Sequence, residues 1–170
     1  MNDVKDGILI ACIGNIFLGD DGFGFEVAQA FAGASLPPRV QLVDYGIRGL
    51  DLAYALLRPW RAVIIVDAIA RGDAPGTLYL LRPADPLTNQ APSGLDPHAM
   101  DPMRVLATAR SIGAAGADIY ILGCEPQDFG ETLEGRIGLS PPVAAAVPEA
   151  VIMVLELAEK LTSAASQCAA

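Results

Sequence analysis

Two continuous apolar runs constrain the fold of this chain more than any other feature. Residues 7–13 read GILIACI and residues 62–66 read AVIIV, without a charged or amide side chain in either run. A strand with one solvated face would carry polar side chains at alternate positions, so both runs are typical of strands that are buried on both faces. Such strands belong to parallel sheets that helices cover on two sides. The sequence therefore predicts an α/β fold.

The length of the chain fits a single domain. It has 170 residues, of which 52% are hydrophobic but only 6% are aromatic, so the core must consist mainly of Ala, Val, Ile and Leu. No repeat or interdomain linker interrupts the pattern. We expect one domain over residues 1–162, followed by a flexible C-terminal tail over residues 163–170.

Hydrophobic periodicity and turn residues predict the remaining elements. Strands are expected at 40–43, 77–81 and 118–123, and helices at 22–32, 49–57, 102–112 and 140–161. Asp20 or Asp21 is the expected N-cap of the first helix, Asp101 that of the third and Ser140 that of the last. Pro148 lies inside the last helix, where it predicts a kink or a restart.

The short connection before residues 77–81 fixes the topology. Only residues 67–76 separate this strand from the one before it, and a parallel crossover needs a dozen or more residues. The strand should therefore run antiparallel at an edge of the sheet. The expected fold is a single-domain three-layer sandwich: a mostly parallel, twisted five-stranded sheet with one antiparallel edge strand and helices on both faces. Residues 82–100 must then climb the height of the sheet, which brings His98 to the edge where the parallel strands end.

Charge and cysteine content exclude several classes of protein. The net charge is −9, with 11 basic and 20 acidic residues and no cluster of Lys and Arg, so we expect no nucleic-acid partner and no anionic membrane partner. Three cysteines without CxxC spacing argue against a disulfide framework or a thiolate zinc site. Without a signal peptide or an apolar run of about 18 residues, a cytoplasmic location is expected.

The candidate site residues follow from the edge at which the parallel strands end, because ligands of such sheets bind there. Asp21, Asp44 and Asp67 follow the first three strands, and His98 is the only histidine. Taken singly, these residues have simpler explanations, such as a helix cap, a turn or a surface side chain. Together, Asp21, Asp67 and His98 predict an open metal site that suits nickel or zinc and leaves positions for water or substrate.

Two other motif assignments fail on particular residues. Residues 14–19 have the GxxxxG spacing of a phosphate-binding loop, but Asp20 and Asp21 follow where Lys and Ser or Thr are needed. A phosphoacceptor receiver domain also places an acidic pair after its first strand and an Asp after its third. It needs a Lys after its fifth strand, where this chain reads Gly-Cys-Glu-Pro.

Several motifs resemble those of a known family. The sequence IGNIFLGDDGFG at 13–24 resembles the N-terminal signature of the hydrogenase maturation endopeptidases, and IIVDAI at 64–69 matches a second specific motif. VDYG at 43–46, GCEP at 123–126 and GLSPPV at 138–143 follow in the family's order and spacing. The resemblance covers nearly the whole chain.

The resemblance implies a function and a partner. That family removes a short C-terminal peptide from the large-subunit precursor of nickel–iron hydrogenases after nickel insertion, and the precursor's nickel is thought to be the recognition element. The nickel would therefore be carried by the precursor rather than held as a permanent cofactor. Cadmium or zinc is expected to substitute for it in vitro.

The resemblance also implies roles for particular residues. The family's metal-contacting positions fall on Asp21, Asp67 and His98, and a further family aspartate falls on Asp44. This chain departs from the family pattern at Tyr45 and Ile47, where small residues and Thr are commoner. Asp21, Asp44 and Asp67 are the candidate catalytic carboxylates.

The sequence leaves alternatives open. Water could be activated by the metal or by a carboxylate, and Cys124 with His98 is a formal nucleophile pair. A non-enzymatic module that checks for nickel would use the same metal ligands. It would not need Asp44, which is the feature that separates the two functions.

Overall fold

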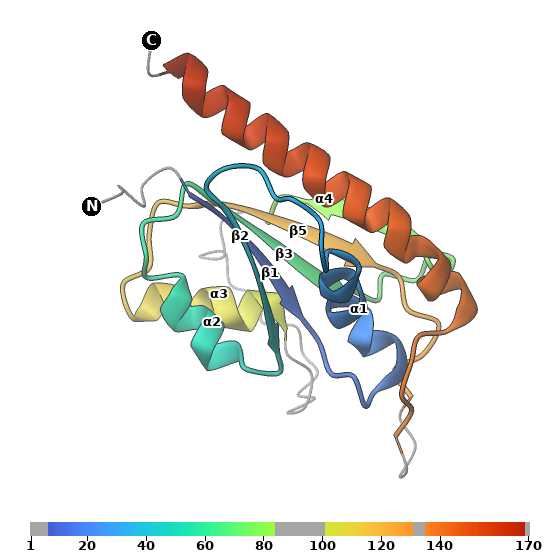
Figure 1. Cartoon of the computed structure of the whole chain (residues 1–170). Helices are drawn as coiled ribbons and strands as arrows, with labels where there is room; N and C mark the ends of the chain where they lie inside the picture. The colour runs from blue at the N-terminus through green and yellow to red at the C-terminus, as the bar shows by residue number, and fades with distance from the viewer. Residues whose placement is uncertain (1–6, 84–100, 131–134, 169–170) are drawn as a thin grey trace.

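One five-stranded sheet lies between two layers of helices (Figure 1). The computed structural model describes residues 7–83, 101–130 and 135–168, with 164–168 as backbone only. The strands are β1 (Ile8–Ile13), β2 (Val40–Gly46), β3 (Ala62–Ala68), β4 (Leu78–Leu81) and β5 (Asp118–Cys124). The helices are the 3₁₀ helix η2 (Gly19–Gly22), α1 (Phe23–Ala30), α2 (Gly49–Ala55), α3 (Pro102–Ser111) and α4 (Pro141–Cys168). The predicted fold class is confirmed.

The strand order is β2-β1-β3-β5-β4, and only β4 runs antiparallel to its neighbour. The edge position and the direction of β4 were both expected from the short connection that precedes it. In register, Leu78 pairs with Cys124 and Leu81 with Ile121. The four parallel strands therefore end at one edge of the sheet, close to the turn that leads into β4.

Each face of the sheet has its own hydrophobic core. Alternate residues of β1 face opposite layers: Ile8, Ile10 and Cys12 pack with α1 and α4, whereas Leu9, Ala11 and Ile13 pack with α2 and α3. All six residues of β1 are buried, because both faces of the strand are covered. This double burial is the physical reason for the continuous apolar run in the sequence.

The structure differs from expectation where the strands end. β2 continues to Gly46 and β3 to Ala68, so Asp44 and Asp67 lie in the last part of their strands rather than after them. Residues 19–21, expected to be loop, belong to η2. The assignment of Asp20 or Asp21 as N-cap of α1 is wrong, because Gly22 holds that position and no side chain caps the helix. Both carboxylates have other partners.

Helix α4 is longer than expected. It continues through Pro148 without a break and ends at Cys168, so the expected restart is wrong and residues 163–168 are helical. By length and composition Pro141–Ser163 could cross a membrane. One stripe of this helix is buried against the sheet at helical spacing, with Val143, Ala146, Ala150, Val154 and Ala158 in the core.

The close approach of α1 to the sheet depends on Gly24. A Cβ atom at this position would lie 2.2 Å from the backbone oxygen of Ile13 and 2.7 Å from that of Val66. We expect Gly24→Ala to lower the free energy of unfolding by about 2 kcal/mol, because backbone atoms must move to make room. Urea denaturation is the measurement.

The matched control is Gly22→Ala, two residues earlier. There the nearest heavy atom to a new Cβ would be 3.4 Å away, an ordinary contact. Equal destabilisation by the two substitutions would contradict the assignment of Gly24 as the contact point.

Candidate active site

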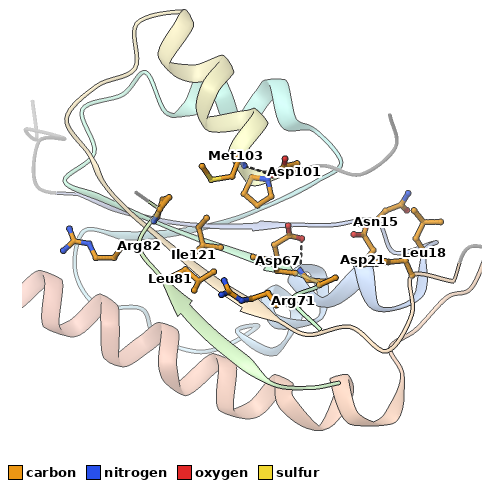
Figure 2. Close-up of a pocket in the computed structure, with 16 residues that line it drawn as sticks. Asn15, Leu18, Asp21, Asp67, Arg71, Leu81, Arg82, Asp101, Met103 and Ile121 are labelled. Atoms are coloured by element: carbon orange, nitrogen blue, oxygen red, sulfur yellow. Dashed lines mark hydrogen bonds between the residues drawn. The ribbon is translucent and has the colours of Figure 1, made fainter. Parts of the chain in front are cut away.

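A cavity of about 870 Å³ opens at the edge where the parallel strands end (Figure 2). Its walls come from the loop after β1, the end of β3, the turn into β4, the start of α3 and β5. Most of the lining is apolar, and the polar side chains are Asn15, Asp21, Asp67, Arg71, Arg82 and Asp101. A mostly apolar cavity of this size with a few convergent polar groups is typical of a ligand site.

Asp21 and Asp67 both line this cavity. Oδ2 of Asp21 accepts a hydrogen bond from the backbone N–H of Asn15 at 2.8 Å, which holds the side chain against the loop after β1. Oδ1 of Asp67 accepts one from the N–H of Ala68 at 2.8 Å. Only 4% of Asp67 is exposed to solvent.

The electrostatics of Asp67 are unfavourable to its charged form. Burial raises its pKa well above the ordinary value, and the negative charges of Asp21 and, less strongly, Asp101 raise it further. The hydrogen bond from Ala68 opposes this shift but does not cancel it. Two carboxylates that repel one another in a buried wall are the arrangement that a bound cation stabilises.

Asp101 is a third cavity carboxylate that the sequence predicted only as a helix cap. One of its oxygens, Oδ1, does cap α3, since it accepts a hydrogen bond from the N–H of Met103 at 2.9 Å. The cap position also places the side chain in the cavity wall, close enough to Asp67 to affect its pKa. In the sequence, only its position three residues after His98 indicates that Asp101 could lie at the site.

Asp20, next to the metal-ligand candidate Asp21, has a structural role. Its fully buried carboxylate accepts hydrogen bonds from the N–H groups of Gln127 (2.8 Å), Asp128 (3.2 Å) and Ser140 (2.6 Å), and from the Ser140 hydroxyl (2.8 Å). Ser140 directly precedes α4, as expected of its cap, and its hydroxyl donates a hydrogen bond to Asp20. The network fixes η2, and with it Asp21, against the segment that follows β5.

The structure does not bring Asp44 into the cavity. In register Asp44 pairs with Cys12, whose thiol lies in the core on the α1 and α4 side. Burial is the main cause of the raised pKa of that thiol, and the charge of Asp44 raises it further. Its Oδ1 accepts a hydrogen bond from the N–H of Gly46 at 2.9 Å. Asp44 is not among the cavity-lining residues.

His98 lies outside the described residues, so its predicted place at this edge stays a prediction. Within the described ranges, no group of three or more His, Cys, Asp and Glu side chains is arranged to hold a metal ion. The start of α3, which follows residue 100, does lie at the cavity.

Cys124 is a poor nucleophile in this structure. Burial, with the charges of Asp20 and Glu125, raises the pKa of its thiol to about 12. The side chain lies in the core on the α1 and α4 side, whereas Asp67 lines the cavity. A thiol in this environment stays protonated near neutral pH, which argues against the pairing of Cys124 with His98.

The α/β fold and the convergent carboxylates place a candidate active site where the parallel strands end, and comparison with known proteins gives the family. Residues 25–157 match the family model HycI, described as hydrogenase maturation protease. This chain belongs to the hydrogenase maturation protease family.

Individual relatives agree over most of the chain. The hydrogenase 2 maturation protease of Escherichia coli K12 is 30% identical over 152 residues, 87% of this chain and 88% of that protein. The hydrogenase expression/formation protein HupD of Rhodobacter capsulatus is 32% identical over 148 residues, 85% of this chain and 69% of that protein. The solved structure of the hydrogenase maturating endopeptidase HybD from E. coli superimposes with a TM-score of 0.71 at 29% identity, covering 91% of this chain and 93% of that one.

The Asp20 network predicts a large effect of a small substitution. Asp20→Asn replaces one acceptor oxygen by an NH₂ group that faces N–H and O–H donors, so buried donors lose their partners. We expect the free energy of unfolding to fall by about 3 kcal/mol in urea denaturation. Asp51→Asn, at an exposed carboxylate on α2, is the control and should have almost no effect.

Asp67→Asn should stabilise the protein in the absence of any metal. The pKa of Asp67 is raised in the folded state, so its charged form destabilises the fold at neutral pH. Asn keeps an acceptor for the N–H of Ala68 and carries no charge. We expect a gain of about 1–2 kcal/mol in the free energy of unfolding at pH 7.

The stability difference between Asp67→Asn and the unsubstituted protein should depend on pH. A raised pKa means that the stabilising contribution of the neutral carboxyl is complete below the unfolded-state value, ~3.9, and is lost as the pH rises through the folded-state pKa. The gap between Asp67→Asn and the unsubstituted protein should therefore close as the pH falls towards ~4. A gap that is constant with pH would contradict the repulsion between these carboxylates.

Proposed function

We propose that this protein is an endopeptidase that removes the C-terminal peptide from a nickel-loaded hydrogenase large-subunit precursor. The observation that carries the proposal is the pair of cavity carboxylates, Asp21 and Asp67, in a member of the hydrogenase maturation protease family. The cavity, at about 870 Å³, has room for a peptide segment.

The precursor's nickel acts as the recognition element in this proposal. Asp21 and Asp67 fit a cation because their repulsion, which raises the pKa of Asp67, is relieved when a positive charge lies between them. His98 supplies the third ligand, and cysteines of the precursor hold the same ion. Since carboxylate and imidazole ligands leave open positions, the free protein binds metal weakly. Cadmium or zinc would then substitute for nickel in vitro.

Peptide hydrolysis needs a base for water and an acid for the leaving amine. A cavity carboxylate, Asp21 or Asp67, takes a proton from the attacking water and returns it to the leaving nitrogen. The precursor's cation would polarise the scissile carbonyl or the water. Asp44 is a weaker candidate for the base, because its oxygen is bonded to the N–H of Gly46 and its side chain does not line the cavity.

The proposed setting is the cytoplasm, with the precursor as the partner and with neither nucleic acid nor a membrane involved. The net charge of −9 opposes binding to anionic polymers and anionic membrane surfaces.

The test uses purified precursor, with and without nickel, incubated with this protein and analysed by mass spectrometry. We expect a shortened product only from the nickel-loaded precursor. Asp67→Asn and His98→Ala should each lower the cleavage rate by roughly 100-fold or more, since each removes a proposed ligand. Asp51→Asn, at the exposed carboxylate on α2, should cleave normally.

Two outcomes would contradict the proposal. Equal cleavage of the nickel-free precursor would exclude nickel as the recognition element. Binding of the nickel-loaded precursor without shortening would favour a non-enzymatic nickel-checking module. An Asp44→Asn variant that binds but does not cleave would restore Asp44 as the catalytic base.

A further inference from the structure

The turn between β3 and β4 is held by one buried carboxylate. Glu125, just after β5, accepts hydrogen bonds from the N–H of Arg71 (2.7 Å), the N–H of Gly72 (3.0 Å) and the hydroxyl of Tyr79 (2.6 Å). Its own backbone completes the attachment, with Gly76 N–H donating to its carbonyl and its N–H donating to Thr77. The turn is therefore fixed at its start and at its end.

The negative charge of Glu125 is stabilised by hydrogen bonds from the turn and from Tyr79. Burial alone would raise the pKa of Glu125, but the hydrogen bonds from Tyr79 and from the backbone of the turn lower it overall. The carboxylate is thus ionised at neutral pH, and its oxygens are engaged by N–H and O–H donors.

The same turn places Arg71 in the cavity wall (Figure 2). The N–H of Arg71 is bonded to Glu125, and its guanidinium carbon lies 5.2 Å from the centre of the Tyr79 ring. The backbone of Arg71 is therefore restrained by a hydrogen bond, and its guanidinium by a cation–π contact. An arginine restrained in this way loses less conformational entropy when it binds an anion.

Arg71 differs from the other arginine of the cavity. Arg82 forms a salt bridge with Asp118 at 3.1 Å and lies over the ring of Tyr120 at 4.9 Å. For Arg71 the structure gives no salt bridge within the described residues. The cavity thus contains one arginine without a carboxylate partner there, in a chain of net charge −9.

We propose that Arg71 is a specificity-determining residue that binds an acidic side chain in the C-terminal segment of the precursor, and that Glu125 is the positioning residue that holds Arg71 in place. The inference rests on the proposed function and names a feature of its substrate. The guanidinium fork matches a carboxylate, with two N–H donors for two oxygens. Asp21, Asp67 and Asp101 would repel an acidic group elsewhere in the cavity, so the wall at Arg71 is the place that accommodates one.

Equilibrium binding of nickel-loaded precursor tests the role of Arg71. Arg71→Ala should weaken binding roughly tenfold, with Arg71→Lys intermediate, and the loss should shrink at high salt. Arg58→Ala is the matched control. Arg58 also stacks on an aromatic ring, that of Trp60 at 4.6 Å, but it does not line the cavity, and the substitution should leave binding unchanged.

Precursor variants identify the anion. The acidic residues of the precursor's C-terminal segment are changed one at a time to their amides. At one position the change should weaken binding to the unsubstituted protein roughly tenfold. The same precursor variant should bind to Arg71→Ala no more weakly than the unchanged precursor does. Amidation of the precursor's C-terminus should have no effect. A loss caused only by amidation, or no loss at any position, would overturn the assignment to a side-chain carboxylate.

The positioning role of Glu125 has its own test. Glu125→Gln should weaken precursor binding in the unsubstituted protein but cause no additional loss in the Arg71→Ala background. If Glu125→Gln fails to fold, Tyr79→Phe is the second variant: it keeps the ring and removes the hydroxyl that bonds to Glu125 and Asp73. It should show the same dependence on Arg71 with a smaller effect. Additive losses would show that Glu125 acts on stability alone and overturn the positioning role.

Cleavage measured in the same samples separates the two proposals. Binding that depends on Arg71 without cleavage would refute the endopeptidase function and leave the assignment of Arg71 standing. Cleavage of a precursor that binds Arg71→Ala and the unsubstituted protein with equal affinity would support the endopeptidase function and refute the assignment of Arg71. No binding of nickel-loaded precursor by the unsubstituted protein would overturn both.

Discussion

The direction of β4 is the constraint on which the site depends. The turn from β3 to β4 is too short to cross the sheet, so β4 must run antiparallel to β5 at the edge. The chain then has to return to the other end of the sheet before α3 can lead into a parallel β5. As a result α3 starts beside the end of β3, with Asp101 in the same wall as Asp67. The cavity is located between the turn and the start of α3, both of which line it.

The site combines features that are unfavourable alone and useful together. The buried Asp67 repels Asp21 and Asp101, so the charged form of Asp67 lowers the stability of the fold, which depends on the two hydrophobic cores. Other buried carboxylates show the contrast: Asp20 and Glu125 have full sets of donors and serve only to hold segments in place. The carboxylates that repel one another line the cavity, where a ligand can compensate for their charge.

Sequence patterns predicted the architecture well because buried strands and connection lengths are local properties. The runs at β1 and β3, the antiparallel β4 and the convergence of Asp21 with Asp67 all follow from them. The failures concern side chains whose partners are distant in the sequence. Nothing near Asp20 indicates that its donors lie more than a hundred residues away, so a helix cap was the natural expectation. Arg71 has no motif at all, because its position depends on a contact with Glu125 that only the folded sheet creates.

The Asp20 network also determines when the site can form during synthesis. Its four donors come from Gln127, Asp128 and Ser140, which leave the ribosome long after β1 and η2. A nascent chain that ends at β5 has the sheet strands but no donors for this buried carboxylate, and α4 does not yet cover the α1 side of the sheet. The loop that carries Asp21 is held in place only once the C-terminal part of the chain has docked. A half-made chain therefore has a nearly complete sheet, but the loop that carries Asp21 is fixed only when the whole domain exists.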